Sequence, residues 1–366
     1  MTQNNHQLKI CLITVTLSDG GAERCAATLS RFFVKNNIDV HHIVFSGKVI
    51  YDYSGQLLHL ESLKDQSNSL WSRFKRFKAL KSYIKSNDFD FIIDFRTKEY
   101  YLQEFIIHNF IYKNTIQTIH SHELTSYFPK NKLLAKLLYH KSLKLVSVSK
   151  EIEGKVTNDY GFKNITQIYN PIDIDSIESN HEINSIDFEY ILGVGSMNKN
   201  IKQFDRLIEC YSNSILPQNN IKLIILGDGK LKKNWILLAK KLGQEQNIIF
   251  KGNIENPFSY YKQAFLTCLT SKYEGLPMVL LESLASGTPV VAYDCHSGPR
   301  EIIQHNQNGL LVENQNKTAF IEALNSMIED KKLYLHCKSN AKSSIENYNV
   351  DTIGNQWLQL FKDLSK

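Results

Sequence analysis

Short apolar runs alternate along this chain with stretches in which apolar residues recur at helical spacing. The apolar runs predict strands at residues 8–16, 39–45, 89–95, 115–120, 143–149, 190–194, 222–226, 248–251, 264–269 and 290–292. The periodic stretches predict helices at residues 22–34, 150–160, 203–211, 276–287 and 353–364. Strands that alternate with helices in this way indicate an α/β architecture with parallel sheets.

The apolar periodicity lapses between residues 173 and 187, shortly after the structure-breaking pair Asn170-Pro171. A chain of 366 residues is long enough for two domains of ordinary size. We therefore predict two doubly wound domains, at residues 1–172 and 188–349, with a linker at residues 173–187. The remaining residues, 350–366, contain the last predicted helix.

Residues 273–303 hold the most informative stretch, in which an acidic Gly-Pro turn precedes a helix. We expect this helix to begin near Leu276, because Pro277 is tolerated in a first turn, and to end at Gly287, which suits a left-handed cap. The first turn of a helix presents free N–H groups and the positive end of the helix dipole. The predicted binding place for an anion such as phosphate is formed by Gly275, Leu276, Pro277, Met278 and Val279.

Two glutamates flank this predicted anion site. Glu282 lies about five residues into the helix, so its carboxylate is roughly 7 Å from the anion, a separation that fits the ribose of a nucleotide diphosphate. Glu274 lies in the preceding turn, where a sugar attached to the distal phosphate would be. One short segment is thus suited to holding both ends of a nucleotide-sugar; the alternative is a capped strand-helix-strand unit with two solvated glutamates.

Glu274 and Glu282, with seven residues between them, resemble the E-x7-E motif of retaining glycosyltransferases of family 4, which have a GT-B fold of two Rossmann-like domains. The sequence around them carries the resemblance: E-G-L-P before the helix, A-S-G-T-P-V-V after it, then S-G-P-R-E-I-I and N-G-L-L-V. It covers nearly all of the C-terminal half and is looser in the N-terminal half.

The resemblance implies transfer of a hexose or N-acetylhexosamine from a nucleotide-sugar, UDP-linked, to a hydroxyl of a glycan or lipid-linked glycan, with retention at the anomeric carbon. It places this reaction in bacterial cell-surface polysaccharide synthesis. The acceptor would lie mainly on the N-terminal domain and the donor on the C-terminal one. The helix in residues 350–366 would pack back on the N-terminal domain.

The turn after the strand at residues 190–194 matches the family only in part. The resemblance implies an arginine directly after Gly195 and a lysine about five residues later, both holding the donor diphosphate. Lys202 matches the lysine with one extra residue in the loop, and Lys199 is the alternative. Ser196 stands at the arginine position; a hydroxyl donates one hydrogen bond but carries no charge, so this departure affects either donor affinity or the assignment of the loop.

In the N-terminal half, two loops after strands carry candidate ligand contacts. Gly20 and Gly21 separate the first strand from a helix, so backbone can approach a ligand closely there, and the family has a similar G-G-A-E run at its interdomain cleft. His120 ends the strand at residues 115–120, where open α/β sheets place ligand contacts. It resembles the family's strand-end histidine that reaches the donor sugar or acceptor, and we favour it over His122.

These matches imply roles for individual residues. His120, Glu274 and Lys202 are the predicted catalytic residues, and Gly20, Gly21, Ser196 and Glu282 join the helix start and Lys202 in binding the donor. The pair His120 and His122 could also suggest a metal, but no cluster at ligand spacing completes such a site. We expect no metal and no cofactor, because lysine and backbone N–H groups supply the positive field.

The composition indicates in which cellular compartment the protein is expected. Residues 1–7 are polar and form no signal peptide, and no apolar run approaches the ~18 residues of a membrane span. The six cysteines are scattered, which favours reduced thiols and a cytoplasmic protein.

The net charge of +6 is concentrated in the N-terminal half. Residues 71–85 and 130–144 are rich in Lys and Arg, contain no acid, and have apolar residues at helical spacing. Such basic amphipathic helices are typical of membrane-surface elements, although an ordinary solvated face over a core stripe has the same pattern. We predict reversible association with the inner face of an anionic membrane.

Three other functions fit part of the sequence. A nucleotide-sugar epimerase of the same architecture would consume the donor without an acceptor. A nucleic-acid-binding protein would use the positive charge, but the sequence has no aromatic-interleaved recognition motif, so we expect no nucleic acid partner. A catalytically silent GT-B scaffold is slightly favoured by Ser196.

Overall fold

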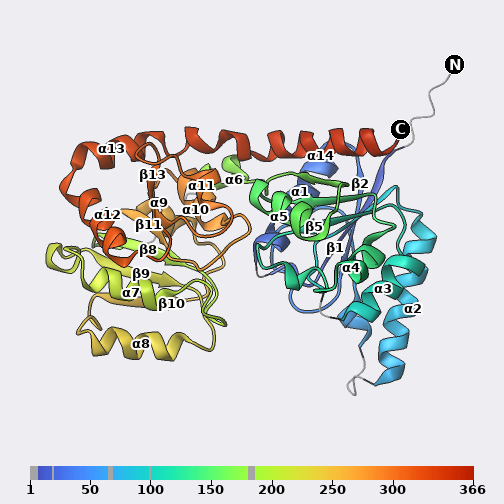
Figure 1. Ribbon diagram of the computed structural model, residues 1–366, viewed down its shortest axis with the longest axis horizontal. Helices are drawn as coiled ribbons and strands as arrows, with labels where there is room; N and C mark the ends of the chain where they lie inside the picture. Colours follow the sequence, from blue (N-terminus) through green and yellow to red (C-terminus); the bar gives the residue numbers. More distant parts are fainter. Residues whose placement is uncertain (1–6, 19, 65–68, 99, 180–185) are drawn as a thin grey trace. The chain divides into compact units, whose positions relative to one another are not determined.

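The computed structural model describes residues 7–18, 20–64, 69–98, 100–179 and 186–366. The chain forms two compact units, one of residues 1–171 with 350–366 and the other of residues 172–349 (Figure 1). Each unit is built on one parallel sheet with its own apolar core.

The first unit has a seven-stranded parallel sheet in the order β3-β2-β1-β4-β5-β6-β7. Its strands are β1 (Lys9–Thr14), β2 (Asp39–Val44), β3 (Gln56–His59), β4 (Phe91–Asp94), β5 (Thr115–Ile119), β6 (Lys144–Ser147) and β7 (Ile165–Gln167). Because the strands are parallel, their carboxyl ends all lie at one edge of the sheet.

Helices cover both faces of this sheet. One face packs on α1 (Gly21–Lys35) and α14 (Val350–Leu364). The other carries α2 (Leu70–Asn87), α3 (Tyr101–Phe110), α4 (Lys132–Tyr139) and α5 (Lys150–Tyr160), as right-handed crossovers between these strands require. Two short 3-10 helices, η1 (Leu60–Leu63) and η2 (Leu124–Ser126), lie in the connections.

The second unit has a six-stranded parallel sheet in the order β10-β9-β8-β11-β12-β13. Its strands are β8 (Tyr190–Val194), β9 (Lys222–Leu226), β10 (Ile248–Gly252), β11 (Leu266–Leu269), β12 (Val290–Tyr293) and β13 (Gly309–Val312). Its helical segments are α6 (Ile174–Glu178), α7 (Phe204–Ser212), η3 (Pro217–Asn219), α8 (Lys232–Lys241), α9 (Phe258–Gln263), α10 (Met278–Ala285), α11 (Pro299–Ile302), α12 (Lys317–Glu329), α13 (Lys331–Asn340) and η4 (Ser343–Tyr348).

The predicted α/β architecture with two doubly wound, parallel-sheet domains is confirmed. Apolar runs identify strands here because a parallel strand is buried on both faces. The short strands β3, β7 and β13 were not predicted; each lies at an end of its sheet, and β3 is largely exposed.

Two segments differ from the prediction. The linker at residues 173–187 includes α6, whose Asp173 side chain accepts a hydrogen bond from the Ser176 N–H at 3.1 Å; residues 180–185 lie outside the described residues. In α2, the apolar stripe joins the core at Leu80 and Ile84, whereas Trp71 and Phe74 in the first turns are exposed. The pattern at residues 71–85 is therefore mainly a core stripe.

The C-terminal helix α14 is part of the first unit and packs on α1. Phe361 stacks on Phe91 with ring centroids 5.0 Å apart, and Trp357 is buried in the same core. Gly354 allows the close approach of the two helices: a Cβ there would lie 2.3 Å from the ring of Phe32. The helix thus packs on one face of the sheet through aromatic contacts that leave no room for a side chain at position 354 unless Phe32 moves.

We predict opposite effects for two glycine-to-alanine changes in helices of this unit. Gly354→Ala should destabilise the first unit by about 1–3 kcal/mol, because Phe32 must move to admit the methyl group. Gly154→Ala on α5, where an added Cβ meets nothing within 4 Å, should stabilise it by about 0.4–1 kcal/mol. Urea unfolding monitored by Trp fluorescence checks both, and equal shifts would contradict the packing described for α14.

Candidate active site

The candidate site of the second unit lies where β8 and β11 run side by side in the sheet. From these two strands the chain leaves in opposite directions, toward β9 and toward β12, so the loops at their carboxyl ends open a crevice between them. The loop at residues 195–203 follows β8, and residues 270–277 follow β11.

An ion pair and several hydrogen bonds join these two loops. Lys202 Nζ lies 2.7 Å from Glu274 Oε1, and the same carboxylate oxygen accepts a hydrogen bond from Ser271 Oγ at 2.5 Å. The Lys272 N–H donates to the Ile201 carbonyl at 2.8 Å. The side chains of Lys202 and Glu274 are 20% and 12% exposed, so the pair is accessible at the crevice and partly shielded from water.

The start of α10 follows shortly after Glu274 of this ion pair. The helix begins at Met278 with Pro277 as its N-cap, two residues later than expected, and no side chain caps its N-terminus. A neighbouring loop packs tightly against it: Ser297 Oγ donates to the Gly275 carbonyl at 2.6 Å, and a Cβ on Gly298 would lie 2.4 Å from Pro277 Cδ. The tightly packed start of α10 therefore has no side-chain cap, and a helix start of this kind is a typical place for an anion to bind.

Glu282 lies on the buried side of α10. It is 4% exposed, and its Oε2 accepts a hydrogen bond from Tyr261 Oη of α9 at 2.9 Å. Glu274 and Glu282 thus face different neighbours, the first the β8 loop and the second α9. Sequence reasoning missed Tyr261, because the pair is separated by 21 positions and no local spacing connects them.

The β8 loop distinguishes its two candidate lysines. Lys202 contacts Glu274, whereas Lys199 is exposed. Ser196 is also exposed, and its hydroxyl accepts a hydrogen bond from the Asn198 N–H at 3.4 Å. At this turn the structure therefore brings Lys202, but not Ser196 or Lys199, to the ion pair with Glu274.

In the first unit, the predicted residues follow β1 and β5 at the carboxyl edge of the sheet. Gly20 is the N-cap of α1, which begins at Gly21, and no side chain caps this helix start. His120 follows β5; both of its ring nitrogens are shielded from solvent and have no hydrogen-bond partner among the described residues. His122, in contrast, has its Nε2 3.3 Å from Glu151 Oε1.

A buried cluster of charged residues, which the sequence analysis did not identify, follows β4 at the same edge. Asp94 accepts hydrogen bonds from Arg96 Nη2 at 2.8 Å and Lys98 Nζ at 2.6 Å, and Arg96 also donates to Glu104 of α3 at 2.9 Å. Although burial raises the pKa of Asp94, Arg96 and Lys98 hold that pKa well below its usual range. The signal available in the sequence was D-F-R-T-K at the end of a strand.

This cluster also contains a group of side chains with metal-ligating atoms. Asp94, Glu104 and His108 have ligand atoms within 4.8 Å of one another, all buried. The positive charge beside the two carboxylates is already supplied by Arg96 and Lys98, so the arrangement is a balanced ion network and not a vacant cation site.

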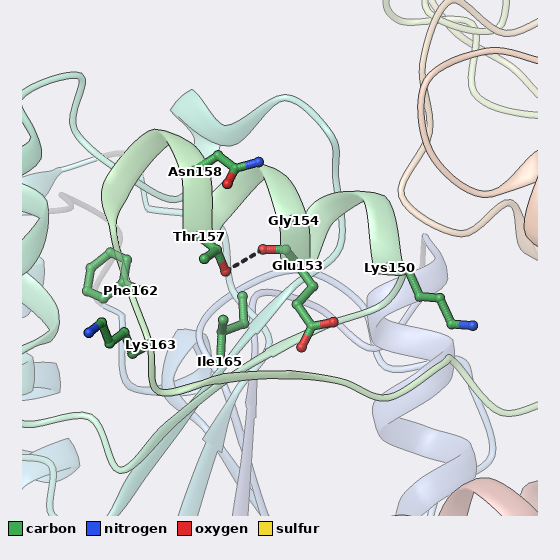
Figure 2. A pocket seen from close by; sticks show the side chains of 8 residues that line it. All are labelled: Lys150, Glu153, Gly154, Thr157, Asn158, Phe162, Lys163 and Ile165. Atoms are coloured by element: carbon green, nitrogen blue, oxygen red, sulfur yellow. Dashed lines mark hydrogen bonds between the residues drawn. The ribbon is translucent and has the colours of Figure 1, made fainter.

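Figure 2 shows a separate surface cavity of about 510 Å³ between α5 and β7. Lys150, Glu153 and Lys163 contribute charges of both signs, and Thr157 Oγ1 donates to the Glu153 carbonyl at 2.9 Å. None of the predicted site residues lines this cavity. We assign no part of the donor site to it.

Two family models together match most of the chain. The model described as "Glycosyltransferase Family 4" matches residues 19–176, and "Glycosyl transferases group 1" matches residues 176–344. A curated relative from Campylobacter jejuni, N-acetylgalactosamine-N,N'-diacetylbacillosaminyl-diphospho-undecaprenol 4-alpha-N-acetylgalactosaminyltransferase, is 31% identical over 92% of this chain and 94% of its own length. This chain belongs to glycosyltransferase family 4.

Further relatives agree with this membership. A second C. jejuni enzyme, a GalNAc-alpha-(1->4)-GalNAc-alpha-(1->3)-diNAcBac-PP-undecaprenol alpha-1,4-N-acetyl-D-galactosaminyltransferase, is 28% identical over 98% of this glycosyltransferase and 99% of the relative. The Erwinia amylovora amylovoran biosynthesis glycosyltransferase AmsD is 25% identical over 95% and 97%.

Solved structures confirm the GT-B fold. A mutant of S. aureus TarM, in complex with fondaparinux, alpha-GlcNAc-glycerol and UDP, superposes with a TM-score of 0.78 at 17% identity, covering 97% of this glycosyltransferase and 100% of TarM. Anabaena HepE in complex with UDP and glucose gives a TM-score of 0.78 at 18% identity, covering 98% and 100%.

In the part of the chain that the structure describes, we find no helix with the length and apolar character needed to span a bilayer.

The shielded ring nitrogens of His120 predict a pH-dependent stability. Burial lowers the pKa of His120 to about 3, so between about pH 3 and 6.5 the unfolded chain binds a proton that the folded state does not. Stability should therefore fall as the pH drops from about 6.5 to 5, with roughly 2 kcal/mol attributable to this residue.

His120→Gln removes this titration and should give a shallower dependence of unfolding free energy on pH. Some slope remains, because burial lowers the pKa of His42 to about 4. Unfolding in urea across this pH range measures the difference; parallel profiles for the two proteins would contradict the burial of the His120 nitrogens.

Proposed function

We propose that this glycosyltransferase transfers a hexose or N-acetylhexosamine from a UDP-sugar to a hydroxyl of a glycan or lipid-linked glycan, with retention at the anomeric carbon, in cell-surface polysaccharide synthesis. The observation that carries the proposal is the Lys202–Glu274 ion pair beside the uncapped start of α10. The names of the two C. jejuni relatives give undecaprenyl-diphosphate-linked glycans as their substrates, and TarM and HepE were solved with UDP.

In this proposal the donor lies on the second unit and the acceptor mainly on the first. Lys202 and the N–H groups at the start of α10 stabilise the diphosphate as its bond to the anomeric carbon breaks. Glu274 orients the transferred sugar, and Glu282 binds the ribose. His120 contacts the donor sugar or the acceptor, and Gly20 and Gly21 let backbone approach the donor. Residues of the chain supply the positive charge, so no metal or other cofactor is invoked.

The protein is proposed to act at the inner face of an anionic membrane, held there reversibly from the cytoplasm. The basic segment at residues 130–144 supports this, because α4 exposes both lysines and leucines. In the segment at residues 71–85, Trp71 and Phe74 expose apolar side chains.

The direct test is incubation with a panel of nucleotide-sugars, with and without polyprenyl-diphosphate-linked glycan acceptors, followed by product analysis. The expected product has an α-linked hexose or N-acetylhexosamine from a UDP donor. Donor conversion without an acceptor would identify an epimerase instead, and no conversion of any donor would indicate a silent scaffold. Proton NMR of the new anomeric signal separates retention from inversion.

Glu282→Ala should weaken binding of free UDP by roughly tenfold or more, because it removes the proposed ribose contact. Tyr261→Phe is the matched control: it removes the hydrogen bond between Tyr261 and Glu282 but leaves the carboxylate. Both variants should lose stability, and only Glu282→Ala should lose nucleotide affinity. Calorimetry with UDP makes the comparison, and an unchanged affinity in Glu282→Ala would remove this residue from the site.

Glu274→Gln should lower kcat by roughly a hundredfold while UDP affinity stays equal or increases. The carboxylate is proposed to act on the sugar, and its loss frees Lys202 for the diphosphate. Glu322→Gln, on the exposed side of α12, is a control that should behave as the unmodified protein. A kcat within about a factor of two would show that Glu274 has no part in turnover.

A further inference from the structure

Two neighbouring helices of the first unit expose large apolar side chains. On α3 these are Leu102, Ile106 and Phe110, which recur every fourth residue and so form one stripe; Leu102 is 77% exposed and Phe110 69%. On α4 the exposed side chains are Leu133, Leu134 and Leu137, with Leu133 at 77%. These six residues are called the α3–α4 surface below.

The two helices lie side by side on the same face of the sheet (Figure 1). Their inner sides meet through His108 and Tyr139, whose ring centroids are 5.7 Å apart, and Lys141 Nζ donates to the Asn109 carbonyl at 3.0 Å. Ile107 and Leu138 are buried beneath them. Since both inner sides face the sheet, both apolar stripes face away from it.

The charge around these stripes is positive. Lys130, Lys132, Lys136 and Lys141 are exposed, and residues 130–144 contain no Asp or Glu. The single acid of α3, Glu104, is 4% exposed and bonded to Arg96. Exposed lysines therefore surround the apolar α3–α4 surface, and no exposed carboxylate lies on the two helices.

We propose that the α3–α4 surface inserts its apolar side chains into the interfacial region of an anionic bilayer, with the lysines at the level of the lipid phosphates. Long lysine stems can lie along apolar surface while their ammonium groups stay at the headgroups. The proposal rests on the proposed function, because a lipid-linked acceptor is carried by such a bilayer. The proposal extends the membrane-binding surface to α3, which contains no Lys or Arg. It also adds insertion of apolar side chains into the bilayer to the attraction between charges.

The charge pattern favours a membrane over another copy of this chain. A symmetric contact between two copies brings the same patch of each together, so lysine would face lysine and the contact would be repelled. An anionic lipid surface instead complements every lysine in the patch. Exposed apolar patches of this kind mark interaction sites in folded proteins.

The test uses the full chain and vesicles of phosphatidylcholine with or without phosphatidylglycerol. Binding is measured by co-sedimentation at about 0.1 and 0.5 M salt, since screening shortens charge attraction as ionic strength rises. The apolar variant is Leu133→Ser with Leu137→Ser. Its matched control is Leu335→Ser on α13 of the second unit, where the leucine is 50% exposed. A charge variant combines Lys132→Gln with Lys136→Gln.

The apolar variant should bind anionic vesicles roughly tenfold more weakly at both salt concentrations. The charge variant should lose binding at low salt and approach the unmodified protein at high salt, and Leu335→Ser should bind normally. A Phe110→Trp variant should gain fluorescence quenching by lipids brominated on the acyl chains, which reports insertion of α3. Equal binding by the apolar variant and its control, or no added quenching at position 110, would overturn the proposal.

Two further measurements separate this surface from catalysis. With a water-soluble acceptor the apolar variant should retain full turnover, whereas with an acceptor embedded in vesicles its turnover should fall with its binding. Loss of turnover on the soluble acceptor would place these leucines in the fold or the acceptor site and overturn the proposal. If no acceptor is glycosylated, the proposed function fails, but the vesicle-binding measurements still test whether the α3–α4 surface binds a membrane. Leucine-dependent dimers in light scattering, without vesicle binding, would show that a second copy covers the patch.

Discussion

The ion pair between Lys202 and Glu274 is the interaction on which the candidate donor site depends. It joins two loops that the sheet alone would leave apart, because the chain leaves β8 and β11 in opposite directions. Thr270 reinforces the junction: its hydroxyl lies 3.0 Å from the Lys202 carbonyl oxygen and 3.1 Å from that of Gln203. These contacts hold the two loops together, and a site that recognises developing charge requires groups positioned in advance.

In the first unit, a buried ion network occupies the corresponding place, at the carboxyl end of β4 where the strand order reverses. Its sheet changes direction between β1 and β4, and Asp94 at the end of β4 is bonded to Arg96 and Lys98. Arg96 extends the network to Glu104, so a charge-assisted hydrogen bond links the inner side of α3 to the sheet. Removing one partner would leave a buried charge uncompensated, which typically costs 3–5 kcal/mol. The network thus fixes the helix whose outer side carries Leu102, Ile106 and Phe110.

The sequence predicted those features that depend on local pattern. The parallel strands were found because residues such as Ile191 and Leu192 are buried on both faces, and α10 was placed to within two residues by its proline and glycine. Trp71 and Leu80 belong to one apolar series spaced by three residues, but such a series drifts around a helix of 3.6 residues per turn, so Trp71 is exposed and Leu80, on the opposite side, is buried. The Tyr261 partner of Glu282 and the charges after β4 depend on tertiary contacts, which local spacing does not encode.

Because Ser196 carries no charge, the candidate donor site depends more strongly on Lys202, which pairs with Glu274 and is proposed to bind the donor diphosphate. With a hydroxyl where the family has an arginine, Lys202 is the side-chain cation that the structure brings to the candidate donor crevice, and it is already paired with Glu274. In the proposed function the donor diphosphate competes with Glu274 for this ammonium group. Binding of the diphosphate then releases the carboxylate toward the sugar. Lys202 thereby couples recognition of the departing diphosphate to orientation of the transferred sugar. A second, permanent cation at the diphosphate would weaken this coupling.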